Sequence, residues 1–290
     1  MNSVASLLVP LDGSALAARS LGCAAWLARR MNAQLRVLQV GLSSPFPDLQ
    51  IPAGIREHCA IQQRSGDPAK TILDEIAHHG ARLLVLSARG DGLETDSGEP
   101  RLLGHVSQSV VEQSPVPVLV LPEHYRERLP WQHLLVPVSG EPSAEHALAV
   151  AVELANDLDL SVTVAHVVDP EHGETGDGSL VAAARYADAP HHELPEAFDE
   201  MISRALPQFS QEDTRCIRGV SLCHGDIAGE LLKLAAAPET SAVAVGWHGR
   251  FAQGHAEVLK QLLDELACPL LLVRPRPRMP FRLKVGAELD

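Results

Sequence analysis

Two copies of one pattern run along this chain, and the repeat constrains the fold more than any other feature. The segment Ser6-Leu-Leu-Val-Pro-Leu-Asp-Gly-Ser14 recurs as His133-Leu-Leu-Val-Pro-Val-Ser-Gly-Glu141, at an offset of 127 residues. Three more matches follow in the same order: Val37–Val40 with Val164–Val167, Gly66-Asp67 with Gly225-Asp226, and Pro117–Val120 with Pro269–Leu272. Because ordered matches of this kind indicate a repeated folding unit, we expect two similar domains within the 290 residues.

The offsets and the local composition set the expected domain boundaries. We predict a first domain over residues 1–125, a linker over 126–132, a second domain over 133–275 and a C-terminal tail over 276–290. The offset grows by 32 residues between the second and third matches, which predicts an insertion at 169–200 in the second domain. This insertion holds nine acidic residues and one basic residue, so we expect it to begin as a solvated loop.

Short apolar runs alternate with helical patterns in each half. The runs expected to be strands in the first half are Leu7–Leu11, Leu35–Val40, a run around Ile61, Leu83–Ser87 and Val118–Leu121. Helical spacing covers Ser14–Met31, with Ser14 as N-cap, and Pro68–His79, with Gly80 as C-cap. Strands that are apolar on both faces and alternate with helices are typical of a parallel sheet. We therefore expect two tandem open-sheet α/β sandwich domains, Rossmann-like, with five mostly parallel strands each.

Charge and cysteine content exclude several classes of protein. Acidic residues outnumber basic ones by 37 to 24, which gives a net charge of -13 and argues against a nucleic-acid partner. No apolar stretch reaches the roughly 18 residues of a membrane span, and the N-terminus has no basic signal-peptide start. The five cysteines form no C-x-x-C pair, which favours reduced thiols. We expect a cytoplasmic protein with no membrane partner.

Several ordered motifs together resemble the universal stress protein family. They are Leu-Val-Pro-Leu-Asp-Gly-Ser at 8–14, Arg-Ser-Gly-Asp-Pro at 64–68, Gly-Ala-Arg-Leu-Leu-Val-Leu-Ser-Ala-Arg-Gly at 80–90, and Leu-Leu-Gly-His-Val-Ser at 102–107. The resemblance covers residues 4–122 and, less closely, 133–275, so the chain looks like a tandem member of that family. It implies domains of the adenine-nucleotide alpha hydrolase-like type in a cytoplasmic, often dimeric stress-response protein that is usually without catalysis.

The resemblance also implies a place for a nucleotide. Some members of the family bind ATP through a G-x2-G-x9-G-[S/T] loop and an Asp on the first strand, because glycines let backbone amides approach phosphates. In an open sheet this site lies at the carboxyl ends of the strands. The candidate cofactor-binding residues are Asp12, Val40, Gly90, Gly104, Ser107, Gly246 and Gly249.

The first half departs from that loop. Ser87 stands at the first glycine position, Gly90 and Gly104 enclose 13 residues, and His105 replaces the hydroxyl residue. The intervening stretch 91–100 carries four acidic residues. At an effective dielectric of about 20, each carboxylate at roughly 8 Å from a phosphate charge costs about 2 kcal/mol. This broken spacing also favours a turn role for the two glycines, and Asp12 is interpreted either as a nucleotide contact or as a turn residue.

The second half departs differently. Gly246 and Gly249 restore the first two glycines, but Ser139 replaces the strand Asp. Counting back from Pro269 places Ala256 at the third glycine and Leu259 at the useful hydroxyl. The sequence therefore assigns no cofactor to the protein, and we expect any ATP to bind weakly in the first half.

Two other classes of function are alternatives. A zinc site is suggested by Cys216, Cys223 and His224, with His191-His192-Glu193. Their spacing is unusual for zinc and favours cysteines that pack in the core.

An enzyme that hydrolyses adenine nucleotides is the other alternative. The sequence holds no G-x-S-x-G, G-x4-G-K-[ST] or H-E-x-x-H motif, so we expect a non-enzyme.

The expected partner of each half is the other half. Single-domain members of the family that the chain resembles dimerise through the closing strand, and bare edge strands invite pairing. We therefore predict an intrachain pseudo-dimer in which Val118–Leu121 lies beside Leu270–Val273. A homodimer of the whole chain and an unidentified protein partner are further expectations.

Overall fold

The computed structural model describes residues 5–41, 53–90, 102–168, 202–203, 205–251 and 256–275. The predicted insertion (169–200), the acidic stretch at 91–100 and the predicted tail (276–290) lie outside the described residues.

The first half contains every strand that the sequence predicts for it. Its strands are β1 (Ser6–Leu11), β2 (Gln34–Val40), β3 (Cys59–Arg64), β4 (Ala81–Ser87) and β5 (Val118–Leu121). Its helices are α1 (Ala15–Ala18), α2 (Ser20–Arg30), the short 3-10 helix η1 (Ala53–His58), α3 (Pro68–His79) and α4 (His105–Gln113). The single helix expected over Ser14–Met31 is therefore divided at Arg19, whose N–H bonds to Leu16 O at 3.1 Å in a tighter turn.

The second half repeats this order. Its strands are β6 (His133–Pro137), β7 (Ser161–Val168), β8 (Ile217–His224), β9 (Thr240–Gly246) and β10 (Leu270–Val273). Its helices are α5 (Pro142–Leu158), the 3-10 helix η3 (Asp213–Cys216), α8 (Ile227–Ala235) and α9 (Glu257–Glu265).

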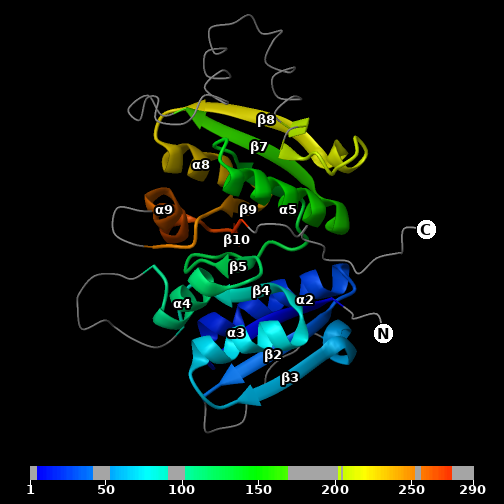
Figure 1. The fold of residues 1–290 in the computed structure, drawn as a ribbon, viewed down its shortest axis with the longest axis vertical. Coiled ribbons are helices and arrows are strands. Elements are labelled where there is room, and N and C mark those ends of the chain that lie inside the picture. Colours follow the sequence, from blue (N-terminus) through cyan, green and yellow to red (C-terminus); the bar gives the residue numbers. More distant parts are fainter. Residues whose placement is uncertain are drawn as a thin grey trace, which may run out of the picture.

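Ten strands of the described chain form one continuous sheet, in the order β3-β2-β1-β4-β5-β10-β9-β6-β7-β8. Within each half all neighbouring strands are parallel, whereas β5 and β10 pair antiparallel. Leu119 lies opposite Leu271 at the centre of that junction. Figure 1 shows β5 and β10 between the two halves. The predicted pairing of the closing strands is thus confirmed, and the two halves share one sheet.

Apolar side chains cover both faces of this sheet. One buried cluster includes Leu119 and Leu271, and the cluster on the other face includes Val120 and Leu270. Because both clusters contain residues of both halves, the core runs across the β5–β10 junction. Helices cover both faces, as expected for an open parallel sheet (Figure 1).

Contacts outside the sheet also tie the halves together. The rings of Trp26, in α2, and Trp131, just before β6, lie 5.6 Å apart. Arg30, near the end of α2, donates from Nη2 to the carbonyl of Leu158 at 2.8 Å. Arg19 donates to the carbonyl of Tyr125, so the chain that follows β5 lies against the first helices.

Local capping follows the sequence signals. Ser14 Oγ accepts from Ala17 N at 2.9 Å, and Asp67 Oδ1 accepts from Lys70 N at 2.8 Å. Asp226 accepts from Gly229 N at 2.6 Å. The Asp of each repeated Gly-Asp pair is therefore a helix N-cap, as predicted. Gly80 ends α3 at a φ of 60°, a left-handed conformation that favours glycine.

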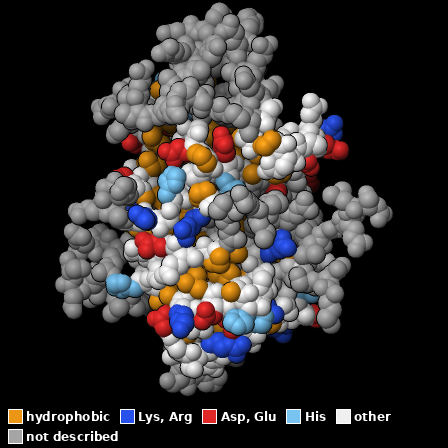
Figure 2. Space-filling model, viewed as in Figure 1, with side chains coloured by type: hydrophobic (Ala, Val, Ile, Leu, Met, Phe, Trp, Pro, Cys, Tyr) orange, Lys and Arg blue, Asp and Glu red, His pale blue; other side chains and the backbone are white. Residues whose placement is uncertain are grey.

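The surface of the described chain is mixed in charge. Acidic and basic side chains lie interspersed on the face shown in Figure 2. A nucleic-acid groove needs positive charge gathered along one surface. A search of the described residues finds no helix that is both long and apolar enough to cross a membrane.

Candidate functional site

The carboxyl ends of the parallel strands carry the residues that the sequence singled out. In the first half the structure brings Asp12, after β1, against Gly90, after β4. A Cβ atom added to Gly90 would lie 1.7 Å from Asp12 Oδ2, so the Asp12 carboxylate would have to rotate away from any larger residue at this position. Val40 ends β2 opposite Arg64 and packs, half-buried, against the core.

Asp12 is engaged in the turn that starts the first helix. Its Oδ1 accepts a hydrogen bond from Ser14 N at 2.9 Å, which is the side-chain bond of an Asx turn. Its other oxygen, Oδ2, faces Gly90. The turn interpretation of Asp12 is therefore supported, and one carboxylate oxygen remains beside the candidate glycine.

Ser107 and Gly104 connect the start of α4 to the end of β4. Ser107 Oγ donates to Ser87 O at 3.1 Å, and Gly104 N donates to Ala88 O at 2.9 Å. Ser87 Oγ in turn donates to Arg89 O at 2.7 Å. A phosphate would have to displace the Ser107 bond to receive its hydroxyl hydrogen.

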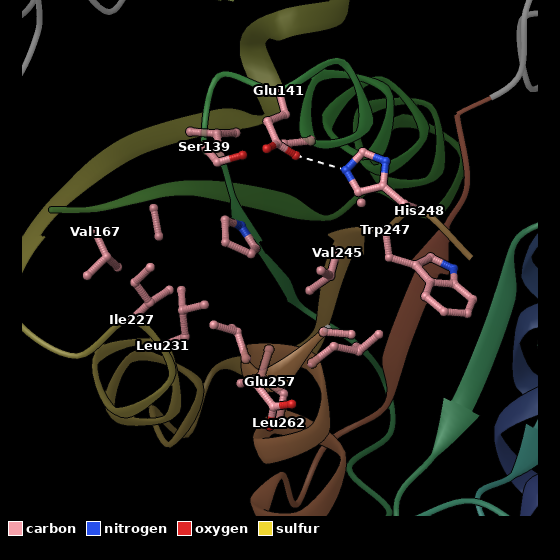
Figure 3. Close-up of a pocket in the computed structure, with 18 of the residues that line it drawn as sticks. Ser139, Glu141, Val167, Ile227, Leu231, Val245, Trp247, His248, Glu257 and Leu262 are labelled. Atoms are coloured by element: carbon pink, nitrogen blue, oxygen red, sulfur yellow. Dashed lines mark hydrogen bonds and ion pairs between the residues drawn. The ribbon is translucent and has the colours of Figure 1, made fainter. Parts of the chain in front are cut away.

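A large pocket lies at the equivalent place in the second half. It has a volume of about 980 Å³ and opens between the carboxyl ends of β6, β7 and β9, the start of α5, and helices α8 and α9 (Figure 3). Its lining residues are 137–139, 141, 144, 165–167, 227, 231, 245–248, 250, 256–259 and 262. Pockets of this volume hold small organic ligands.

The walls of this pocket are aliphatic. Val167, Ile227 and Leu231 line one side, Val245 lies across from them, and Leu262 lies at the base (Figure 3). Trp247 lies on the far side and is 5% exposed. Burial of a ligand's apolar surface against these side chains would supply most of its binding free energy.

Polar groups also line the pocket. His248 Nε2 lies 2.9 Å from Glu141 Oε2, within hydrogen-bond distance, above the pocket (Figure 3). Glu257, in the first turn of α9, lies across the cavity from this pair and beside Leu262 (Figure 3), and it pairs with Lys260 Nζ at 2.8 Å. Arg250 also lines the pocket.

Two further groups at the mouth come from β6 and β7. Ser139, which replaces the family's strand Asp, lies at the rim beside Glu141. His166 Nδ1 lies 3.0 Å from the carbonyl oxygen of Val138. That bond ties the end of β7 to the chain that leaves β6.

The two glycines of the second half have local structural reasons. A Cβ atom on Gly246 would lie 2.0 Å from Ser143 O and 2.6 Å from Ala144 N, so β9 can approach the first turn of α5 only with glycine there. Gly249 has a φ of 85° and faces the guanidinium of Arg274. A phosphate is not needed to explain either glycine.

The third glycine position of the second half is occupied by alanine. Ala256 is the N-cap of α9 with a φ of 59°, a left-handed conformation that costs a residue with a side chain about 1 kcal/mol. Leu259, where the first half has Ser107, is 4% exposed and lines the pocket. The substitutions make this site more apolar than its counterpart.

The cysteines of the second half were the candidate metal ligands. Cys216 packs against the core, and burial raises the pKa of its thiol to about 11. Cys223 lies within strand β8. Among the residues that the structure describes, no three His, Cys, Asp or Glu side chains form a group suited to a metal ion. His191, His192 and Glu193 lie outside them.

The large pocket was not predicted from the sequence. The residues that resemble a nucleotide-binding loop predicted a site in the first half instead. The signal that could have found the pocket was the change to Ser139, Ala256 and Leu259, which removes charge and hydroxyls from a ligand-sized space.

The fold and the pocket define a tandem pair of Rossmann-like α/β domains that share one sheet and carry a ligand-sized cavity at the carboxyl edge. The model of the family described as Usp, the universal stress protein family, matches residues 48–122 and 130–274. The chain therefore belongs to the universal stress protein family, as a member with two domains in tandem.

Individual relatives agree with this assignment. Universal stress protein YxiE of Bacillus subtilis is 29% identical in an alignment of 148 residues that covers 40% of this chain and 97% of that protein. A functionally unknown protein from Pseudomonas aeruginosa PAO1 matches with a TM-score of 0.63 and 18% identity, over 94% of each chain. A universal stress protein from Archaeoglobus fulgidus matches with a TM-score of 0.61 and 15% identity, over 93% of this chain and 98% of that one. At these identities the two structures show a shared fold.

Proposed function

We propose that this protein is a non-catalytic, cytoplasmic stress-response protein that binds a small molecule in the pocket of its second half. The observation that carries the proposal is the pocket itself, a cavity of about 980 Å³ with aliphatic walls and a few convergent polar groups. Concave, mostly apolar sites of this size are the usual form of a small-molecule site.

The groups at the mouth support binding rather than catalysis. A hydroxyl nucleophile needs a base within hydrogen-bond reach. Ser139 is the hydroxyl at the rim, whereas His248 is paired with Glu141 and His166 bonds to the carbonyl of Val138. Among the described contacts, none joins Ser139 to either imidazole.

A weak ATP site in the first half is a second candidate. It is favoured by the approach of Asp12 to Gly90, which leaves one carboxylate oxygen beside the glycine at the carboxyl edge of the sheet. Val40, Gly104 and Ser107 are the other residues proposed to contribute. An Asp12→Asn variant would weaken ATP binding there and leave the second-half pocket intact.

The intrachain pair is proposed to be the functional unit. The closing strands pair within one chain through β5 and β10, so neither strand is left as a bare edge. Light scattering of the purified protein would show whether a homodimer also forms.

The test of the proposed function is to identify molecules that co-purify with the protein. Mass spectrometry after denaturation should release a small molecule from the wild-type chain. Val167→Phe, which adds bulk to the pocket wall, should abolish this release. Ile61→Phe adds bulk at an exposed position of the first half, where 47% of the residue is accessible, and should not change it. Equal release from all three proteins would contradict a site in the second half.

A further inference from the structure

We infer that the pocket of the second half takes a small amphipathic anion, an aliphatic body that ends in a single carboxylate, rather than a nucleotide. This inference rests on the proposed function, because it names the ligand class of the same pocket. Three features carry it: the residues that replace the polar groups of the first half, the aliphatic walls, and the charges at the mouth.

The replacements remove the contacts that a nucleotide needs. Leu259 stands at the position of Ser107, so a buried aliphatic side chain lies where the first half has a hydroxyl. Ser139 stands at the position of Asp12, so the end of β6 lacks the carboxylate that follows β1 in the first half. A nucleotide placed here would leave polar groups against aliphatic side chains without partners, which is unfavourable.

The aliphatic walls suit a hydrocarbon body. Val167, Ile227, Leu231, Val245 and Leu262 surround the cavity from strands and helices of the second half (Figure 3). These branched side chains offer dispersion contacts and no hydrogen bonds. Each methylene of a ligand that enters this space would therefore strengthen binding.

The polar groups that line the pocket match one negative group. The carboxylate of Glu141 is hydrogen-bonded to His248, and that of Glu257 forms an ion pair with Lys260. Arg250 also lines the pocket and makes no ion pair with another residue of the described ranges. A single carboxylate can be met by the Arg250 guanidinium, whereas the several charges of a polyphosphate would also face the two acidic side chains.

A chain-length series tests the aliphatic body. Octanoate, decanoate and dodecanoate would be titrated into the full-length protein below their micelle concentrations, with heat and Trp247 fluorescence as readouts. We expect the dissociation constant to fall about fourfold for each added methylene, the factor that corresponds to burial of one CH2 group. Trp247→Phe should remove the fluorescence change and leave the heat, which places the ligand in this pocket. An affinity that does not change along the series would overturn the aliphatic part of the inference.

Decanol and one variant test the anionic end. We expect decanol, which lacks the carboxylate, to bind about fivefold more weakly than decanoate, the scale of one exposed ion pair. Arg250→Gln should weaken decanoate by the same factor and leave decanol unchanged. Equal affinities of decanol and decanoate would overturn the anionic part of the inference.

A nucleotide control separates this inference from the proposed function. If Mg-ATP changes Trp247 fluorescence and decanoate does not displace it, the ligand class is wrong and the pocket remains a ligand site. If Val167→Phe has no effect on any of these titrations or on co-purified molecules, the proposed function fails together with the inference. Displacement of a co-purified molecule by decanoate but not by Mg-ATP is the result we expect.

Discussion

Glu112, in helix α4 of the first half, accepts a hydrogen bond at its Oε1 atom from the backbone N–H of Phe251, in the second half, at 3.2 Å. Gln108 Nε2 donates to the same oxygen at 3.2 Å, and Arg274 donates to the backbone carbonyl of Glu112. The ring of Phe251 packs on Trp247 at 4.8 Å between centroids. The first half therefore holds the loop that carries the mouth of the second-half pocket.

We expect Glu112→Ala to weaken ligand binding in the second half although the residue belongs to the first. Loss of the acceptor leaves the Phe251 N–H without its partner and frees the loop that bears Arg250. The expected cost is about 1 kcal/mol in stability, which is the usual net worth of one hydrogen bond. Calorimetric titration with decanoate would show a several-fold loss of affinity.

Glu112→Gln is the matched control for that variant. Its amide oxygen can still accept the bond from Phe251, so its affinity should remain close to wild type. Identical affinities for the alanine variant and the wild-type chain would show that the contact does not position the loop.

Gly246→Ala should destabilise the protein because the added Cβ would meet backbone, not a movable side chain. That Cβ atom would lie 2.0 Å from Ser143 O, so β9 and the start of α5 would have to move apart. We expect a loss of about 2 kcal/mol in the free energy of unfolding, the typical cost of overpacking. Urea denaturation at constant m-value would measure it.

Gly219→Ala provides the comparison for that experiment. Gly219 lies in edge strand β8, and a Cβ atom there would have no heavy atom within 4 Å. Its free energy of unfolding should stay within about 0.5 kcal/mol of wild type. If both variants behave alike, the close approach of β9 to α5 is not a constraint.

Much of this fold could be predicted from the sequence because its signals are local. Apolar runs such as Leu83–Ser87 indicate buried parallel strands, and Asp67 before Pro68 marks a helix start. The resemblance to universal stress proteins predicted that Val118–Leu121 lies beside Leu270–Val273, and the structure shows that this pairing is antiparallel. These features depend on neighbouring residues, on the comparison of the two halves or on that resemblance.

The site was less predictable because it depends on contacts between distant segments. No sequence pattern relates Glu112 to Phe251, which are 139 residues apart. The pocket forms where Leu231 of α8 and Leu259 of α9 face the ends of strands. In the nucleotide-loop motif Leu259 counts only as a missing hydroxyl residue, and Leu231 lies outside the motif. The division of the first helix at Arg19 also has no clear signal in the sequence.

Leu271→Asp tests the shared core at the junction of the halves. Leu271 is 2% exposed and lies opposite Leu119 of β5, which is 1% exposed. A carboxylate there has no partner, so we expect a loss of more than about 3 kcal/mol and separation of the two halves. Denaturant unfolding and light scattering would detect both effects.

Ile61→Asp is the control for the junction. Ile61 lies on edge strand β3 and is 47% exposed, so a carboxylate stays hydrated there. Its unfolding midpoint should remain near that of the wild type. An equal effect of the two substitutions would contradict a core that crosses β5 and β10.

Stability should depend on pH through His133, at the start of β6. Burial lowers the pKa of this imidazole below its usual value of 6.5, against a smaller opposite effect of Glu239, and Arg218 lowers it further. Its Nδ1 lies 2.8 Å from Ser161 Oγ. The unfolded chain therefore binds a proton more readily than the folded one, and this residue's contribution to stability is present above about pH 6.5 and is lost as the pH falls below it.

His133→Gln should reduce that dependence, because glutamine does not titrate. Urea unfolding at pH 7.5 and 5.5 would compare the two proteins, and the difference between them isolates His133 from the other histidines. We expect the wild-type chain to lose more stability than the variant between these pH values. A larger loss in the variant would mean that protonated His133 is stabilised in the folded chain, through Glu239.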